Sequence, residues 1–172
     1  MTQQYVIVGG NAAGMSTATR LRRLDETAEI IVLEQGEHVS YASCGLPYHL
    51  SDTVPEEQLA VMGVDQLSAA FDLDIRTGVT ATGIDPDAAT VSVTDADGES
   101  TTIVYDDLVV ATGAEPLVPP MFDLDELEHC HTLRTVSDAT GIRDDVANAE
   151  RALVIGGGYI GLEVAENLHE AG

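Results

Sequence analysis

The sequence predicts an α/β protein with parallel strands and one antiparallel insertion. Three observations lead to this fold class. A strand, a glycine-rich turn and a helix follow one another twice, at Gly9 and again at Gly156. Apolar stretches typical of buried strands lie at 29–34 and 107–111. Alternating apolar and polar residues with turn signals fill positions 79–105, which indicates an antiparallel meander.

The first element is the segment "YVIVGGNAAGMSTATRLRRL". Residues 5–8 are apolar and β-branched and predict a strand, and the glycines after them predict a turn. A helical pattern follows, with apolar positions at Ala13, Ala18, Leu21 and Leu24. The stretch "EIIVLE" (29–34) then predicts a second strand, so we expect a β-α-β unit with parallel strands.

The middle of the chain predicts two short acidic helices and then the meander. The helices are expected at 55–59 and 64–71. Three strands follow, "VTATGI", "ATVSV" and "TTIVY", broken by turns at 85–87 and 97–98. The Asp95–Asp97 run resembles part of a calcium loop but lacks the other ligands, so a hairpin turn is predicted.

A proline-rich stretch, "EPLVPPMF", predicts a linker after the strand "DLVVA". We therefore expect one domain over residues 1–115, and a linker with the start of a second domain over 116–172. In that second part, 129–135 predicts a strand, "SDATGIRDDVANA" a helix capped by Ser137 or Asp138, and "RALVIGGGYIGLEVAENLHEAG" another strand, turn and helix. Because so few strands cannot build a sheet, the second domain is expected to be truncated.

Charge limits the partners and the compartment. Thirty acidic residues face seven arginines and no lysine, and the net charge is −23. Such a field repels nucleic acids and anionic membranes, so neither is an expected partner, and screening by salt predicts a halophilic cytosol. No apolar stretch is long enough for a bilayer, no signal-peptide features open the chain, and only two cysteines occur, so we expect a cytoplasmic protein with reduced thiols.

The two glycine motifs are candidate dinucleotide sites. The second fits G-x-G-x-x-G and comprises Gly156, Gly158, Tyr159, Ile160 and Gly161. The first has Asn11 where the middle glycine is expected, and comprises Gly9, Gly10, Asn11, Ala12, Ala13 and Gly14. Glu34 follows 20 residues later, the position from which an acid binds a ribose hydroxyl. Either motif alone is equally well a tight turn, but the two in context favour dinucleotides, whose pyrophosphate suits the amides of a helix start.

Two further features have a chemical and a structural interpretation. Thr112-Gly113 is either a plain turn or a place where the first dinucleotide approaches the backbone closely. Cys130 is interpreted as a small buried residue, because strand alternation turns it away from the face shared by His129 and His131. No metal site is therefore expected.

Cys44, in "SYASCGLPY", is the candidate catalytic residue. It follows the strand end at Glu34 and is expected at a helix start, where the dipole favours a thiolate. The alternative is an inert buried thiol. A Cys-x4-Cys centre would need a thiol at position 49, where His49 stands, so any redox centre here uses one thiol, through a mixed disulfide or a sulfenic acid.

Five stretches together resemble a known family: "VIVGGNAAGMSTATRLRRLDE", "SYASCGLPY", "YDDLVVATGAEP", "TLRTVSDA" and "VIGGGYIGLEVAENL". The family is the flavin-dependent pyridine nucleotide-disulfide oxidoreductases, in particular their single-cysteine branch. The resemblance implies a Rossmann-like domain that binds FAD through the first motif, Glu34 and Thr112-Gly113. It also implies NAD(P)H at the second motif, and electrons passing from nicotinamide to flavin to Cys44.

Within that branch the resemblance favours a coenzyme A-disulfide reductase. Family oxidases and peroxidases carry a histidine in the first motif, at the position of Ala12 here. The family's coenzyme A positions map onto Ser16, Arg20, Arg23, Ser40 and Ser43; Arg20 is the loosest match and Ser43 replaces a usual asparagine. Arginines suit phosphates, whereas a solvated helix face is the alternative, above all for Arg22.

The resemblance also implies that the chain is an N-terminal fragment. Family members continue through the rest of the nicotinamide domain to a dimerisation domain, so a homodimer is expected for a full-length relative. The residue that selects NADH or NADPH would follow the next strand, beyond Gly172. An oxidase or peroxidase, and an inactive nucleotide-binding fragment, remain the alternatives.

Overall fold

The computed structural model describes residues 2–122 and 126–172, and the chain divides into two compact units. The first unit comprises Met1–Tyr41 and Ala60–Gly113, and the second comprises Ala42–Leu59 and Ala114–Gly172. The second unit thus takes in a segment, Ala42–Leu59, that lies within the predicted first domain. The predicted domain boundary at 115/116 itself stays a prediction.

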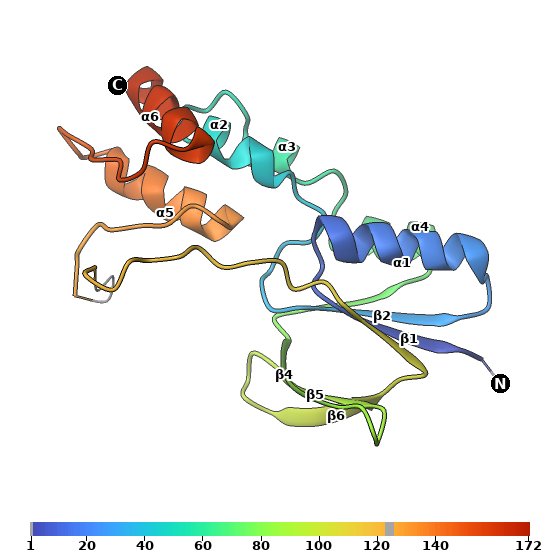
Figure 1. Cartoon of the computed structure of the whole chain (residues 1–172). Coiled ribbons are helices and arrows are strands. Elements are labelled where there is room, and N and C mark those ends of the chain that lie inside the picture. The colour runs from blue at the N-terminus through green and yellow to red at the C-terminus, as the bar shows by residue number, and fades with distance from the viewer. Residues whose placement is uncertain (1, 123–125) are drawn as a thin grey trace. The chain divides into compact units, whose positions relative to one another are not determined.

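A four-stranded parallel sheet forms the centre of the first unit (Figure 1). Its order is β3-β2-β1-β7, and the strands are β1 (Gln4–Val8), β2 (Glu29–Glu34), β3 (Asp74–Thr77) and β7 (Asp107–Val110). In register, Val6 of β1 faces Ile31 on one side and Leu108 on the other. Helix α1 (Ala12–Leu24) joins β1 to β2, which confirms the predicted β-α-β unit. The sequence does not indicate β3, because Ile75 is its only apolar residue.

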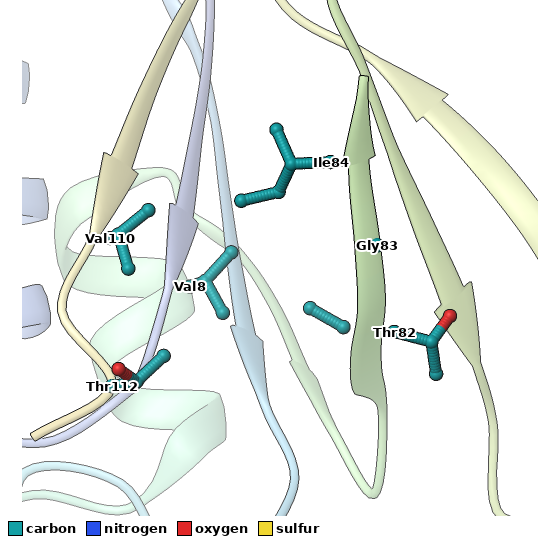
Figure 2. Close-up of a pocket in the computed structure, with 7 residues that line it drawn as sticks. Val8, Thr82, Gly83, Ile84, Val110 and Thr112 are labelled. Carbon is teal, nitrogen blue, oxygen red and sulfur yellow. The ribbon is translucent and has the colours of Figure 1, made fainter. Parts of the chain in front are cut away.

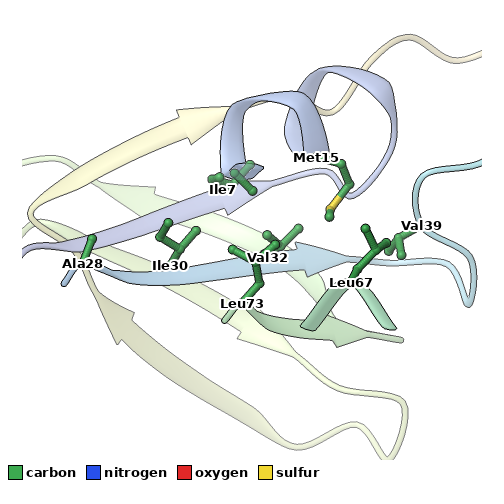
Figure 3. Packing of buried hydrophobic residues seen from close by; sticks show 9 residues of the cluster. Ile7, Met15, Ala28, Ile30, Val32, Val39, Leu67 and Leu73 are labelled. Atoms are coloured by element: carbon green, nitrogen blue, oxygen red, sulfur yellow. The ribbon is translucent and has the colours of Figure 1, made fainter. Parts of the chain in front are cut away.

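Helices α1 and α4 (Val64–Phe71) cover one face of this sheet (Figures 1 and 3). Ile7, Met15 and Val32 are among the buried side chains between them. Leu24 belongs to the predicted helical pattern, yet it is 66% exposed. Met15, Ala18 and Arg22 repeat at helical spacing along the buried stripe of α1, and position 24 falls on the opposite face.

An antiparallel meander packs against the other face of the sheet, as predicted. Its strands are β4 (Thr80–Asp85), β5 (Thr90–Thr94) and β6 (Ser100–Val104). Val6, Val8, Ile31 and Leu33 of the parallel sheet meet Val91, Val93 and Ile103 of the meander in a second buried cluster. The Asp95 carboxylate accepts hydrogen bonds from the amides of Asp97 (3.0 Å) and Glu99 (2.9 Å), so the predicted hairpin turn is confirmed.

The second unit is built from helices. They are the 3₁₀ helix η1 (Ser43–Gly45), α2 (Leu46–His49), α3 (Glu56–Leu59), α5 (Val136–Val146) and α6 (Tyr159–Ala171). Helix α2 packs against both α5 and α6. The cap of α5 is Thr135 and not the predicted Ser137 or Asp138. The Thr135 side chain accepts from the Asp138 amide (3.1 Å) and the Asp138 carboxylate accepts from the Thr135 amide (2.8 Å), a reciprocal capping box.

The strands predicted at 129–135 and 151–156 do not form, so those two predictions are wrong. All the described strands lie in the first unit. His129 has a φ of 57°, and Leu153 and Ile155 are 85% and 65% exposed. A strand without a neighbour leaves its backbone groups to water, so the apolar, β-branched pattern alone does not hold these segments extended. Across residues 2–122 and 126–172, none of the helices combines the length and the apolar character that a bilayer crossing requires.

Candidate functional site

The first glycine turn brings the start of α1 close to the end of β1. Gly9 has a φ of 109°, and its amide donates to the carbonyl of Leu33 (2.8 Å). A Cβ at Gly9 would overlap the carbonyl oxygen of Ala111, and one at Gly14 would overlap the carbonyl oxygen of Gly9. Side chains are therefore excluded from both positions. Asn11 caps the helix in an extended conformation, and Ala12 and Ala13 are exposed in its first turn, whose amides have no acceptor within the helix.

Glu34 is held beside this turn by two backbone amides. One carboxylate oxygen accepts from Gly10 (2.7 Å) and the other from Gly36 (2.8 Å). A Cβ at Gly10 would lie 2.7 Å from Cγ1 of Val39, so this backbone also allows no side chain. The carboxylate keeps further acceptor capacity on both oxygens, and it is fixed at the carboxyl end of β2. A ribose hydroxyl is the type of donor that this arrangement can bind.

A pocket of about 270 Å³ opens between the parallel sheet and β4 (Figure 2). Val8 and Val110, the last residues of β1 and β7, line it together with Thr112 and the 81–84 segment of β4. Gly113 follows with a φ of 72°, a left-handed conformation that suits glycine. The pocket is mostly apolar and lies at the carboxyl ends of parallel strands, where α/β sheets bind ligands.

Cys44 lies in η1, directly before α2, and its side chain is exposed. It is a free thiol, so the prediction of a lone cysteine near a helix start agrees with the structure. The Ala42 amide donates to the carbonyl of Leu59 (2.8 Å), and Leu46 is 2% exposed. His49, at the position that a second thiol would occupy, is 1% exposed. The segment is thus anchored through Leu46 and His49 and presents the thiol outward.

The second glycine turn repeats the backbone of the first. Gly156 has a φ of 115°, and a Cβ at Gly161 would overlap its carbonyl oxygen. Gly158 caps α6, and a Cβ there would meet no atom within 4 Å. Tyr159 and Ile160, the first residues of the helix, are 89% and 59% exposed. The turn therefore leaves the helix start open to an anionic ligand.

The predicted coenzyme A residues fall into two groups. Ser16, Arg20 and Arg23 lie at helical spacing on one exposed face of α1. Ser40 lies beside the first turn, where its amide donates to the carbonyl of Gly10 (3.0 Å), whereas the exposed Ser43 belongs to the second unit. Three of these side chains thus share a face of one helix.

Arg22 has a structural role. It donates to the carbonyls of Ala28 (2.8 Å), Phe71 (2.9 Å) and Asp72 (2.6 Å), and so ties α1 to the end of α4. The interpretation of Arg22 as part of a solvated face is wrong, because the helix turns this position inward.

The 129–131 segment is bound to α5 through two histidine side chains. Asp145 accepts from His131 (2.6 Å) and from His129 (2.9 Å), and these hydrogen bonds, the one from His131 above all, hold the pKa of the Asp145 carboxyl below its ordinary value. Both histidines bind Asp145, which agrees with their predicted common face, although the segment does not form a strand. Cys130 between them is half-buried and not fully buried. The described residues form no cluster of three or more ligating side chains suited to a metal ion.

The sequence profile of the family described as "Pyridine nucleotide-disulphide oxidoreductase" matches residues 3–172. This chain belongs to the pyridine nucleotide-disulphide oxidoreductase family. Members are flavoprotein oxidoreductases that use FAD and NAD(P)H. The residue-by-residue resemblance of the sequence is thereby confirmed at family level.

Curated relatives in this family carry related names. The NAD(P)H sulfur oxidoreductase (CoA-dependent) of Pyrococcus abyssi is 38% identical over 163 residues, which are 94% of this chain and 36% of the relative. A coenzyme A disulfide reductase of Staphylococcus haemolyticus is 33% identical, over 99% of this chain and 39% of the relative. This chain therefore spans less than two fifths of the length of these relatives.

Solved structures of the family superpose closely on this chain. The reduced CoADR-RHD protein of Bacillus anthracis has a TM-score of 0.95 and 38% identity, and the match covers 99% of this chain and 31% of that one. A water-forming NADH oxidase from Lactobacillus brevis, bound to NADH, has a TM-score of 0.92 and 28% identity, with 99% and 38% covered. The fold class is thus confirmed, and both reductases and oxidases share it.

The family's cofactors fit the two turns. For FAD, the first turn offers amides at a helix start, a fixed carboxylate and an apolar pocket, which suit a pyrophosphate, a ribose and a ring respectively. For NAD(P)H, the second turn offers an open helix start.

Sequence reasoning did not single out Arg143, Asp52 or Asn167, which surround the Cys44 segment in the second unit. One signal was available: with only seven cations in 172 residues, every arginine is a candidate for a specific acceptor.

Proposed function

We propose that this chain forms part of a flavoprotein that uses NAD(P)H to reduce coenzyme A disulfide or a similar low-molecular-weight disulfide through Cys44. FAD is proposed at the first glycine turn with Glu34 and Thr112-Gly113, and NAD(P)H at the second turn. The observation that carries the proposal is the exposed thiol of Cys44, which stands alone because position 49 is a buried histidine.

In the proposed reaction, the Cys44 thiolate attacks one sulfur of the disulfide. The bond Cys44-S–S-CoA forms while the substrate S–S bond breaks, and the first CoA leaves as a thiolate. Return of Cys44 to a thiolate takes two electrons and releases the second CoA; the proposal assigns these electrons to NAD(P)H. FAD, when bound, supplies the two-electron carrier between NAD(P)H and Cys44.

The residues proposed for coenzyme A are Ser16, Arg20, Arg23, Ser40 and Ser43. Exposed guanidinium groups at Arg20 and Arg23 can pair with phosphates by charge-assisted hydrogen bonds, and they stand out in a chain of net charge −23. Names of the relatives support this substrate class, since both of the curated relatives described above mention coenzyme A. We also propose a cytoplasmic location, because a reducing compartment keeps two free thiols reduced. A homodimer stays a prediction for the full-length protein.

The first step can be tested on the chain as it stands. Incubation with coenzyme A disulfide in high salt should add one CoA to Cys44, which peptide mapping by mass spectrometry detects. Cys44→Ser should give no adduct, while Cys130→Ser, the matched control, should react like the wild type. Adduct formation at Cys130 alone, or none at all, would contradict the proposal.

An NADH oxidase or peroxidase is the second candidate, favoured by the similarity to the Lactobacillus brevis oxidase. In that case hydrogen peroxide oxidises the Cys44 thiolate to a sulfenic acid and leaves as water. Comparing the rates of Cys44 with peroxide and with coenzyme A disulfide separates the two candidates. If Cys44 reacts faster with peroxide than with coenzyme A disulfide, the oxidase is favoured.

A further inference from the structure

We propose that His49 and Arg143 are positioning residues for Cys44: they fix the short helix α2, and with it the thiol that precedes it, to helix α5. The inference rests on the proposed function, in which Cys44 is the nucleophile. It concerns side chains that the second unit brings together from positions 94 residues apart.

The Cys44 segment needs such an anchor because it has little structure of its own. Helix η1 has three residues and α2 has four, far below the length of about 12 at which an isolated helix becomes stable in water. Its backbone bonds within these helices span three residues, from Gly45 to Ala42 (2.8 Å) and from Leu50 to Pro47 (3.1 Å), and the bond from Ala42 to Leu59 (2.8 Å) fixes the chain just before η1. The direction of the thiol is therefore set by the contacts of α2 with its surroundings.

The His49 ring has two contacts that fix its orientation. Nδ1 lies 2.8 Å from the carbonyl oxygen of Val54, which only accepts, so Nδ1 donates this hydrogen bond. Nη1 of Arg143 lies 3.0 Å from Nε2 and 3.4 Å from Nδ1, so the guanidinium packs over the face of the imidazole and not along the Nε2 lone pair. The His49 side chain is 1% exposed.

Arg143 joins α5 to the residues on both sides of the turn that follows α2. Its Nη2 donates to the Asp52 carboxylate, while Nη1 packs on the ring face of His49. Side chains of Arg143 and Asp52 are 32% and 74% exposed, so the ion pair alone is screened by water and salt. The contact with the buried His49 ring is the part of this arrangement that a salt-rich solvent weakens least.

A second anchor reaches α6. The hydroxyl of Ser51 donates to Oδ1 of Asn167 (2.6 Å), and Nδ2 of Asn167 donates to the carbonyl of Glu163 (2.8 Å). Asn167 is 2% exposed. Helix α2 is therefore held to α6 through Asn167 and to α5 through His49 and Arg143. The contact with α5 involves the charged guanidinium group.

The test compares two substitutions of His49 that both lose the hydrogen bond to Val54 and differ in the ring. His49→Phe keeps an aromatic face for the Arg143 guanidinium, whereas His49→Leu removes it. Arg143→Met removes the guanidinium, and Arg151→Met, an exposed arginine of the same unit, is its matched control.

Two rates of Cys44 are measured for each variant of the full 172-residue chain: adduct formation with coenzyme A disulfide, and alkylation by iodoacetamide. We expect His49→Leu and Arg143→Met to change both rates about tenfold, and His49→Phe and Arg151→Met to stay within about twofold of the wild type. In proton NMR, the ring current of His49 should shift the signals of the Arg143 side chain in the wild type. This shift should be lost in His49→Leu and kept in His49→Phe.

Wild-type rates in both His49→Leu and Arg143→Met would overturn the inference, as would Arg143 signals without a ring-current shift in the wild type. If His49→Leu does not fold, Arg143→Met and Arg151→Met decide. Failure of the proposed function looks different: the wild type would then be alkylated at Cys44 but form no adduct with coenzyme A disulfide, while the alkylation rates still report on positioning.

Discussion

The two glycine turns have the same backbone in different surroundings. Gly9 and Gly156 have φ values of 109° and 115°, and in both turns a Cβ on the last glycine would overlap the carbonyl oxygen of the first. The first turn follows a strand paired on both sides, and its glycines touch Ala111 and Val39. The second follows an exposed, unpaired segment, and Gly157 and Gly158 have open space around them. Turn geometry is therefore a local property, whereas the strand before it depends on its neighbours.

The largest expected difference between the turns concerns their last glycines. Gly14→Ala places a Cβ against the carbonyl oxygen of Gly9 and 3.3 Å from Ile7, in a turn that cannot shift without moving the sheet. We expect a loss of about 3 kcal/mol in the stability of the first unit. Gly161→Ala makes the same overlap with Gly156, but the exposed 152–158 segment can move away, so about 1 kcal/mol or less is expected. Hydrogen exchange detected by mass spectrometry reads the two units separately; equal losses would contradict the comparison.

The apolar residues before the turns give the next largest difference. Val6 and Leu153 both lie three residues before the first glycine, but Val6 is fully buried and Leu153 is 85% exposed. Val6→Ala should cost about 2 kcal/mol, since it removes two buried methyl-sized groups and leaves a cavity. Leu153→Ala removes more atoms yet should stay within about 0.5 kcal/mol. A cost for Leu153→Ala as large as that for Val6→Ala, in the same exchange experiment, would mean that the 152–155 segment is packed in solution.

The smallest expected effect concerns polar contacts in the second unit. These contacts hold its segments together, whereas buried strands do so in the first unit. Hydrogen bonds from His131 and His129 lower the pKa of Asp145 below 3.8, so their stabilising effect is complete above that value and is lost as the pH falls through the folded-state pKa. Asp145→Asn should therefore lower the melting temperature at neutral pH, and the difference from the wild type should shrink in acid below about pH 4. Asp144→Asn, an exposed neighbour, serves as the control. A difference that is independent of pH would contradict this account.

Much of the first unit follows from local sequence patterns. Apolar runs at 5–8 and 29–34, the glycines between them and the alternating 79–105 stretch predicted the parallel strands, the turn and the meander, because their residues meet neighbours of the expected kind. The candidate thiol was also predictable, since position 49 holds a histidine and not a second cysteine.

The sequence by itself determined the order of elements, both glycine turns, the charge and the lone thiol at Cys44, because each depends on residues within a few positions of one another. Tertiary structure decided the rest. Segments 129–135 and 151–156 carry strand patterns without a strand to pair with, and Arg22 lies inward because α1 packs on α4. The contact between His49 and Arg143 joins residues 94 positions apart, and no local pattern encodes it, since only the packing of α2 on α5 brings a ring nitrogen within reach of that guanidinium.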